Sequence, residues 1–248
     1  MIAAAEPAAG LTIFSGRFGS GKTEAAISYA LNLASATGTG VLLIDLDIVT
    51  PYFRSRETQE PLAQRGVEVI APLAIGRHLD VPAITPQILG AIEQAERPTV
   101  MDVGGDRQGA RALGGFSGAI GRRGYQMHFV VNPYRPFTDT LAGLTTSIAE
   151  IENSARLKVT SLISNPNLMD ETTAERILDG HAQVEGFAQE LGLPVARICL
   201  TRRWARLLGP NHFSEPTLIL DRFLTHPWED FTPTEAEGQG ERGRKEKP

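Results

Sequence analysis

A glycine-rich stretch near the N-terminus contains one lysine and one threonine at fixed spacing. Residues 16–23 read G-R-F-G-S-G-K-T, which matches the pattern G-x-x-x-x-G-K-T. Such a loop surrounds phosphate with backbone N–H groups, while its lysine reaches phosphate oxygens and its threonine hydroxyl binds Mg²⁺. The stretch follows an apolar strand pattern and opens a helix, whose free N–H groups favour an anion. We predict a phosphate-binding loop made of Gly16, Arg17, Phe18, Gly19, Ser20, Gly21, Lys22 and Thr23, with Glu24 beside it.

Three aspartates lie where two further strand patterns end. Asp45 and Asp47 close the stretch VLLIDLD, and Asp102 closes PTVMD. A phosphate site of this kind needs carboxylates at neighbouring strand ends to hold hydrated Mg²⁺ and to orient the attacking group. Gly105 follows Asp102 closely, so its N–H could contact the γ-phosphate. The alternative is that Gly104–Gly105 is only a tight turn, because glycine is the default turn residue.

Together these pieces resemble the ParA/MinD group of P-loop ATPases, within the SIMIBI class that also holds nitrogenase iron protein, cobyrinate amidases and dethiobiotin synthetase. The resemblance covers roughly Leu11 to Leu200. It implies that Lys22 contacts the phosphates, that Thr23, Asp45 and Asp102 hold Mg²⁺, and that Asp47 positions the attacking water.

Arg17 has a counterpart in that family. The family loop K-G-G-x-G-K-T has a lysine at the position of Arg17, and this lysine reaches the partner's nucleotide across a dimer interface. The resemblance therefore implies a nucleotide-dependent homodimer in which Arg17 is catalytic, as arginine fingers are. Two departures from the family, Arg17 for lysine and Phe18 for glycine, leave open an arginine that is solvated or steers phosphate within its own chain.

The predicted nucleotide is ATP. No N-K-x-D tetrapeptide, which GTPases of this fold usually carry, occurs in the 248 residues. In the resembled family an asparagine at the end of a late strand often hydrogen-bonds adenine, and Asn165 follows the strand pattern Val159–Ser164. Because Asn-Pro is also a turn former, a purely structural role for Asn165 is an equal alternative.

Short apolar stretches alternate with longer helical patterns, which is typical of a three-layer α/β fold with a mostly parallel sheet covered by helices on both faces. We predict one P-loop nucleotide-binding domain over residues 1–227 and a disordered tail over 228–248, since the tail is charged and rich in Gly and Pro. Predicted strands are Leu11–Ser15, Val41–Asp45, Val67–Ala71, Thr99–Asp102, Gln126–Val131, Val159–Ser164 and Val195–Leu200. Predicted helices are Lys22–Ala36, Pro86–Ala95, Thr138–Asn153 and Thr173–Leu191.

Composition limits the partners. The net charge of -5 gives no nucleic-acid footprint for the whole chain, although the basic run Thr201–Arg206 leaves such contact open beside a solvated helix face. Cys199 is the single cysteine and reads as a buried hydrophobe, so no iron–sulfur cluster forms within one chain. The N-terminus does not resemble a secretory signal, and no C-terminal amphipathic helix of the MinD kind follows; we therefore expect a cytoplasmic protein without membrane cycling.

The sequence is consistent with two functions. The first is a Mg²⁺-dependent ATPase that acts as a dimeric switch on an unidentified partner, with residues 50–57 and 104–118 as its moving loops. The alternative is an ATP-dependent small-molecule ligase or kinase of the dethiobiotin synthetase and cobyrinate amidase superclass, which would need a pocket for a second substrate.

Overall fold

The computed structural model describes residues 10–47, 56–71, 85–94, 96–221 and 223. The tail 228–248 and most of the loop 50–57 lie outside these residues, so the domain boundaries and that loop stay predictions. The described elements, in chain order, are β1 (Leu11–Ser15), α1 (Lys22–Thr37), β2 (Val41–Leu46), α2 (Arg56–Ala63), β3 (Val67–Ile70), α3 (Thr85–Glu93), β4 (Thr99–Val103), α4 (Arg107–Gly114), α5 (Ser117–Arg123), β5 (Gln126–Val131), α6 (Leu141–Ala155), β6 (Ser161–Ser164), the 3₁₀ turn η3 (Met169–Glu171), α7 (Ala174–Leu191), β7 (Val195–Thr201), α8 (Arg202–Leu208) and β8 (Thr217–Leu220).

Within the described residues, eight parallel strands form one sheet in the order β3-β2-β4-β1-β5-β6-β7-β8. Strand β1, the first that the structure describes, lies inside the sheet between β4 and β5. The carboxyl ends of β1, β2 and β4 therefore meet at one edge, and the loops that follow them lie side by side. This order brings the predicted phosphate loop next to the predicted carboxylates.

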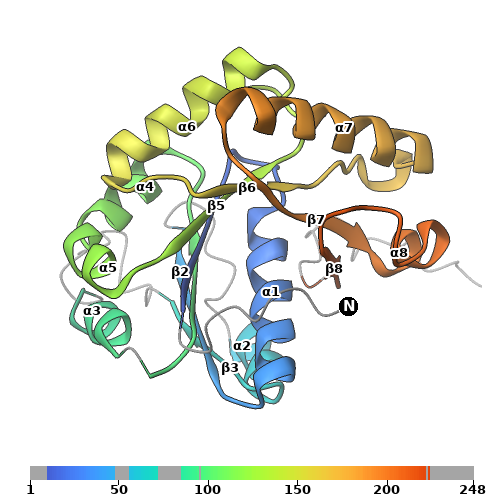
Figure 1. Cartoon of the computed structure of the whole chain (residues 1–248). Helices are drawn as coiled ribbons and strands as arrows, with labels where there is room; N and C mark the ends of the chain where they lie inside the picture. The colour runs from blue at the N-terminus through green and yellow to red at the C-terminus, as the bar shows by residue number, and fades with distance from the viewer. Residues whose placement is uncertain (1–9, 48–55, 72–84, 95, 222, 224–248) are drawn as a thin grey trace, which may run out of the picture.

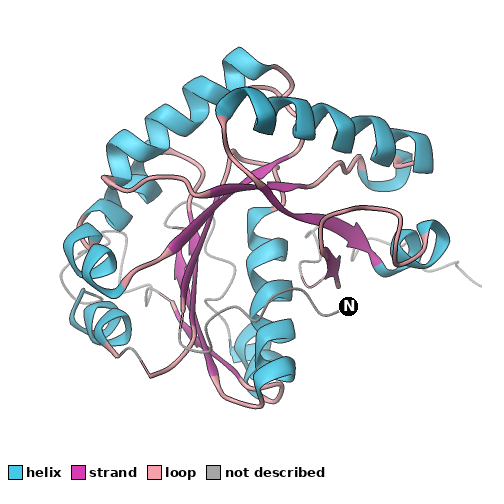
Figure 2. Ribbon diagram, in the orientation of Figure 1, coloured by secondary structure: helices cyan, strands magenta, loops and turns pink. Residues whose placement is uncertain are grey.

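Alternating side chains build a core on each face of the sheet. In β2, Leu42 and Ile44 pack in a cluster with α3 to α7, while Val41 and Leu43 pack in a second cluster with α1 and α2. Figure 1 shows α1 on one side of the sheet and α3 to α6 on the other, and Figure 2 shows the strands as the layer between them. The three-layer α/β fold predicted from the sequence is confirmed.

Helix ends follow the local sequence. Helix α1 begins after Gly21 and ends at Gly38, both in the left-handed conformation, with φ of 86° and 65°. Thr140 and Thr173 cap α6 and α7 by accepting hydrogen bonds from the N–H groups of Gly143 and Arg176. The two predicted helices in this half of the chain thus start within three residues of their expected positions.

The structure also contains elements that the sequence analysis did not predict, including α2 and β8. The glycine-rich segment 104–118, predicted to be a moving loop, is mostly helical, with a break after Gly114. Asp106 caps α4 by accepting from the Gly109 N–H at 2.8 Å. A Cβ on Gly109 would lie 2.6 Å from the Cα of Gly104, so the two residues pack closely. Gly109 is therefore needed for this contact and does not break helix α4.

Candidate functional site

The loop between β1 and α1 has a backbone that requires glycine. Gly16, Gly19 and Gly21 have φ of 153°, 77° and 86°. A Cβ on Gly16 would lie 2.6 Å from the Val130 carbonyl oxygen, and a Cβ on Gly21 would collide with the side-chain amide of Asn165. The three glycines therefore set the loop shape, as the motif predicts.

The start of α1 has donors without protein acceptors. Among the described residues, no side chain caps its first turn, although most helices use one. The Ser20 hydroxyl is also buried without a hydrogen-bond partner in the described part of the chain. Lys22 and Thr23 are buried at the same place. The uncapped N–H groups and the Ser20 hydroxyl, together with the nearby Lys22 ammonium, are suited to an anion with several oxygens.

Acidic side chains from two strands meet the loop. Asp45 and Asp102 are register partners on β2 and β4, and Asp47 follows β2. Lys22 Nζ lies 2.7 Å from Asp47 Oδ2, 3.7 Å from Asp102 Oδ1 and 3.2 Å from Thr23 Oγ1. The N–H of Asp47 donates to Asp45 Oδ1 at 2.8 Å. The structure thus brings together the lysine, the threonine and all three aspartates that the sequence predicts for the site.

Burial and charge determine the protonation of this cluster. Loss of solvent raises the pKa of Asp45 to about 8, with a further contribution from the Asp102 carboxylate. Burial likewise raises the pKa of Asp102, and the nearby Lys22 opposes this effect. Burial alone would lower the pKa of Lys22, but Asp102 and Asp47 outweigh it and raise the pKa. The single ammonium group of Lys22 therefore does not balance the three acidic side chains around it.

The donor set fits Mg²⁺. Asp45 Oδ2 and both carboxylate oxygens of Asp102 are buried and have no hydrogen-bond partner within 3.5 Å among the described residues, although Asp102 Oδ1 lies 3.7 Å from the Lys22 ammonium. Buried oxygens with so little compensation are costly, and carboxylates and hydroxyls are the protein ligands that Mg²⁺ prefers. Thr23 lies in the same cluster through its contact with Lys22.

Arg17 points away from this cluster and contacts its own chain. Its Nε donates to Ser147 Oγ at 2.8 Å, and one terminal nitrogen donates to Glu150 Oε2 at 2.8 Å, both on α6. The guanidinium also lies over the Phe137 ring, 5.2 Å from the centroid. The neighbouring Phe18 side chain is 84% exposed. No local sequence pattern indicates Ser147, Glu150 and Phe137 as partners of Arg17, because only the tertiary fold brings them together.

Three other predicted residues contact the loop or its helix. Asn165 donates from Nδ2 to the Ser20 carbonyl at 2.6 Å, so its amide supports the loop backbone. Its predicted contact with adenine stays a prediction. A Cβ on Gly105 would collide with the Gly16 carbonyl, which places Gly105 against the phosphate loop. Glu24 accepts from the Phe223 N–H at 3.1 and 3.2 Å and so joins the loop to the segment after β8.

The basic run and the single cysteine noted in the sequence take part in structural contacts. The run Thr201–Arg206 lies mostly in α8, where Arg202 is paired with Asp221 at 2.7 Å. Cys199 is buried, which raises the pKa of its thiol to about 12, and the predicted buried role is confirmed. Among the described helices, none has the length and apolar composition needed to cross a bilayer.

No protein-family model and no curated protein matches the chain. Several solved structures do match the chain. Chloroplast FtsY from Physcomitrella patens is 18% identical with a TM-score of 0.50, and the match covers 80% of this chain and 60% of that one. The cell division protein FtsY from Thermotoga maritima is 19% identical with a TM-score of 0.51, covering 79% and 63%. A ParA family ATPase from Chlorobium tepidum is 13% identical with a TM-score of 0.47, covering 81% and 88%.

The chain spans about 60% of the length of the two FtsY structures, and at these identities the likeness concerns the fold. It agrees with the architecture, in which a glycine-rich loop follows an inner strand of a parallel sheet. The chain therefore has the three-layer α/β fold of the P-loop NTPases.

Proposed function

We propose that the protein binds and hydrolyses ATP with Mg²⁺. The observation that supports this most directly is the convergence of Lys22, Asp45, Asp47 and Asp102 on the uncapped start of α1. The N–H groups of the loop would bind the phosphates, and Thr23, Asp45 and Asp102 would hold Mg²⁺. The metal neutralises charge on the β- and γ-phosphates when bound.

The contact between Lys22 and Asp47 suggests how binding prepares the site. A bound γ-phosphate competes for the Lys22 ammonium, because phosphate carries more charge than a single carboxylate. Asp47 Oδ2 then gives up its 2.7 Å contact with Lys22 and can accept a hydrogen bond from the attacking water instead. Phosphate binding and the loss of the Lys22–Asp47 contact are thereby coupled.

We further propose that ATP drives formation of a homodimer that acts on an unidentified partner. Phe18 and Phe137 are 84% and 64% exposed and flank Arg17 beside the phosphate loop. Exposed aromatic side chains next to an arginine are typical of interface centres. A small-molecule ligase or kinase remains the alternative, and strong stimulation of phosphate release by a small acid or alcohol would favour it.

Replacing Lys22 tests nucleotide binding. Lys22→Ala should lose most ATP affinity, because charge-assisted hydrogen bonds contribute roughly 1.5–3 kcal/mol each. Calorimetric titration with Mg·ATP and Mg·GTP measures this and also identifies the base. Lys158→Ala, which removes an exposed lysine paired with Glu152, is the matched control. Parental affinity in Lys22→Ala would reject the site.

Replacing Asp47 separates binding from chemistry. Asp47→Ala should still bind Mg·ATP but release phosphate at least about a hundredfold more slowly, because orienting water matters mainly in the transition state. Binding is measured by calorimetry and turnover by steady-state phosphate release. Equal loss of both would assign Asp47 to metal binding, and unchanged turnover would remove it from the mechanism.

A further inference from the structure

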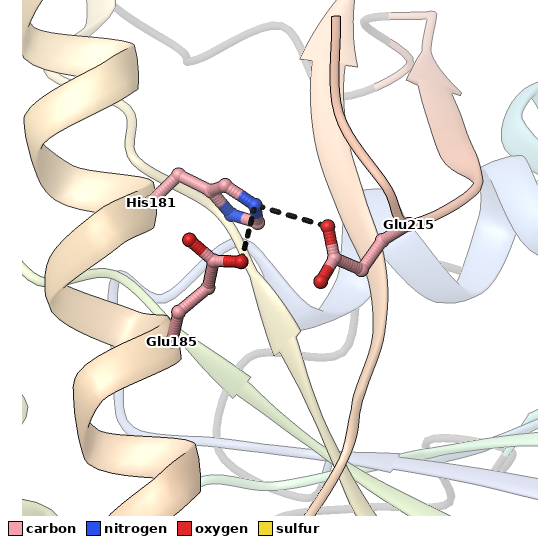
Figure 3. A group of neighbouring side chains, drawn as sticks. All are labelled: His181, Glu185 and Glu215. Carbon is pink, nitrogen blue, oxygen red and sulfur yellow. Dashed lines mark hydrogen bonds and ion pairs between the residues drawn. The ribbon is translucent and has the colours of Figure 1, made fainter. Parts of the chain in front are cut away.

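A second group of metal-ligating side chains, none of them part of the phosphate loop, lies between α7 and the segment that leads into β8. It consists of His181 and Glu185 on α7 and Glu215 just before β8 (Figure 3). One ligand atom from each residue lies within 4.8 Å of the other two. His181 is buried, Glu215 is partly buried and Glu185 is exposed, so solvent reaches the group at Glu185.

We propose that His181, Glu185 and Glu215 form a binding site for a divalent transition-metal ion, with Zn²⁺ the best match. His181 Nε2 lies 3.2 Å from Glu215 Oε2 and 3.9 Å from Glu185 Oε1. In a tetrahedral zinc site, bonds of about 2.0–2.2 Å place ligand atoms about 3.4 Å apart. The two observed separations lie on either side of that value. Three protein ligands leave the fourth position for water.

The charge and ligand types of the group favour this ion. A neutral imidazole with two carboxylates carries two negative charges, which a divalent cation balances. His181 and Glu185 are four residues apart on a helix, so both side chains lie on one face. An imidazole nitrogen with carboxylate oxygens suits zinc, whereas Mg²⁺ prefers oxygen alone.

Neighbouring residues orient the histidine in the manner of a metal ligand. His181 Nδ1 lies 3.0 Å from Ser164 Oγ, so the hydroxyl can accept the Nδ1–H and leave the Nε2 lone pair for a metal. Without metal, the other tautomer donates Nε2–H to Glu215. The Phe213 ring packs edge-on against the imidazole, with centroids 5.0 Å apart, and Ser214 Oγ donates to Glu215 Oε2 at 3.0 Å. These contacts fix two of the three ligands before any ion binds.

Zinc titration of the chelator-stripped full chain tests the site. Titrations with and without a large excess of Mg²⁺, which would compete for the aspartate cluster near Lys22, separate binding there from binding at the histidine site. We expect one Zn²⁺ per chain by calorimetry and a higher unfolding temperature with Zn²⁺ than without. Co²⁺ in place of Zn²⁺ should give visible absorption bands that change when His181 is replaced.

Single substitutions decide whether these residues are the ligands. Glu215→Gln, Glu185→Gln and His181→Gln should each weaken Zn²⁺ binding by about tenfold or more, and Ser164→Ala by about tenfold. Glu190→Gln, an exposed position on the same helix, is the matched control and should bind like the parent. The two glutamate variants keep the test decisive if the buried His181→Gln chain fails to fold. The proposal is overturned if the parent binds no Zn²⁺, or if Glu215→Gln binds it as tightly as the parent.

Discussion

Individual residues of the phosphate loop have different partners in this structure. Lys22 contacts Asp47 inside the site, whereas Arg17 reaches outward to Ser147 and Glu150 on α6. For Arg17 to act on a neighbour's nucleotide, it must give up these contacts. The exchange is feasible, because a solvent-exposed ion pair contributes little to stability in water. Arg17 is therefore held in its own chain by contacts that a phosphate could replace.

Mixing two inactive variants tests whether Arg17 works across a dimer. Arg17→Ala should bind ATP nearly as the parent does but lose dimerisation and turnover together. Combined with Asp47→Ala, which retains Arg17, it would form heterodimers with one complete site, and part of the activity would return. An arginine that acts within its own chain would leave both sites of the mixed dimer defective.

Steady-state phosphate release across mixing ratios measures the recovery, and native mass measurement confirms that heterodimers form. A flat response at the level of the separate variants, in samples where heterodimers are present, would refute the assignment of Arg17 to the neighbour's site.

Long hydrophobic runs allow strands and helices to be predicted from the sequence. Short elements and side-chain partners that depend on tertiary contacts are predicted poorly. The inner strands are recognisable because both faces of a parallel sheet are buried, as in Val41–Leu46. Strand β8 has only four residues, and no alternation distinguishes it from a helical segment. In the site, the loop motif and the aspartates were predictable from local patterns, whereas the contacts of Arg17 with α6 span more than 100 residues of sequence.

The connection from β4 to α4 should tolerate no side chain at Gly105. In Gly105→Ala the new Cβ would press on the Gly16 carbonyl and lie 3.0 Å from Phe18 N, displacing the phosphate loop. We expect ATP affinity to fall by about tenfold or more, because the loop N–H groups no longer converge. Calorimetric titration measures the change.

Gly121→Ala in α5 is the matched control, since nothing lies within 4 Å of a Cβ there. This substitution should leave ATP binding unchanged and raise the free energy of unfolding by roughly 0.5–1 kcal/mol, as alanine does inside a helix. Parental ATP affinity in Gly105→Ala would show that the loop does not depend on this close contact.

The stability of the whole molecule should depend on pH through a buried histidine in the sheet. Burial lowers the pKa of His128 on β5 from 6.5 to about 4. The unfolded chain therefore binds the proton more readily, and the free energy of unfolding falls as pH drops from about 6.5 towards 4, by up to about 3 kcal/mol. Asp45 acts in the opposite direction, because its raised pKa favours proton uptake by the folded chain.

Comparison with His128→Gln isolates the histidine from these other groups. Denaturant unfolding at several pH values should show that the variant loses less stability between pH 6.5 and 4 than the parent. The exposed His212 gives the control, and His212→Gln should keep the parent's acid sensitivity. Parallel pH curves for the parent and His128→Gln would contradict the burial argument.

Dissolved ions reach Arg17 more easily than they reach Lys22, the other cation of the phosphate loop. The side chains of Arg17 and Glu150 are 22% and 29% exposed, whereas those of Lys22 and Asp47 are 9% and 7% exposed. Mobile counterions therefore weaken the outer pair more than the inner pair. Salt therefore loosens the arginine while the lysine stays in place, so the ionic medium can set how readily Arg17 leaves α6 without weakening the inner charges of the site.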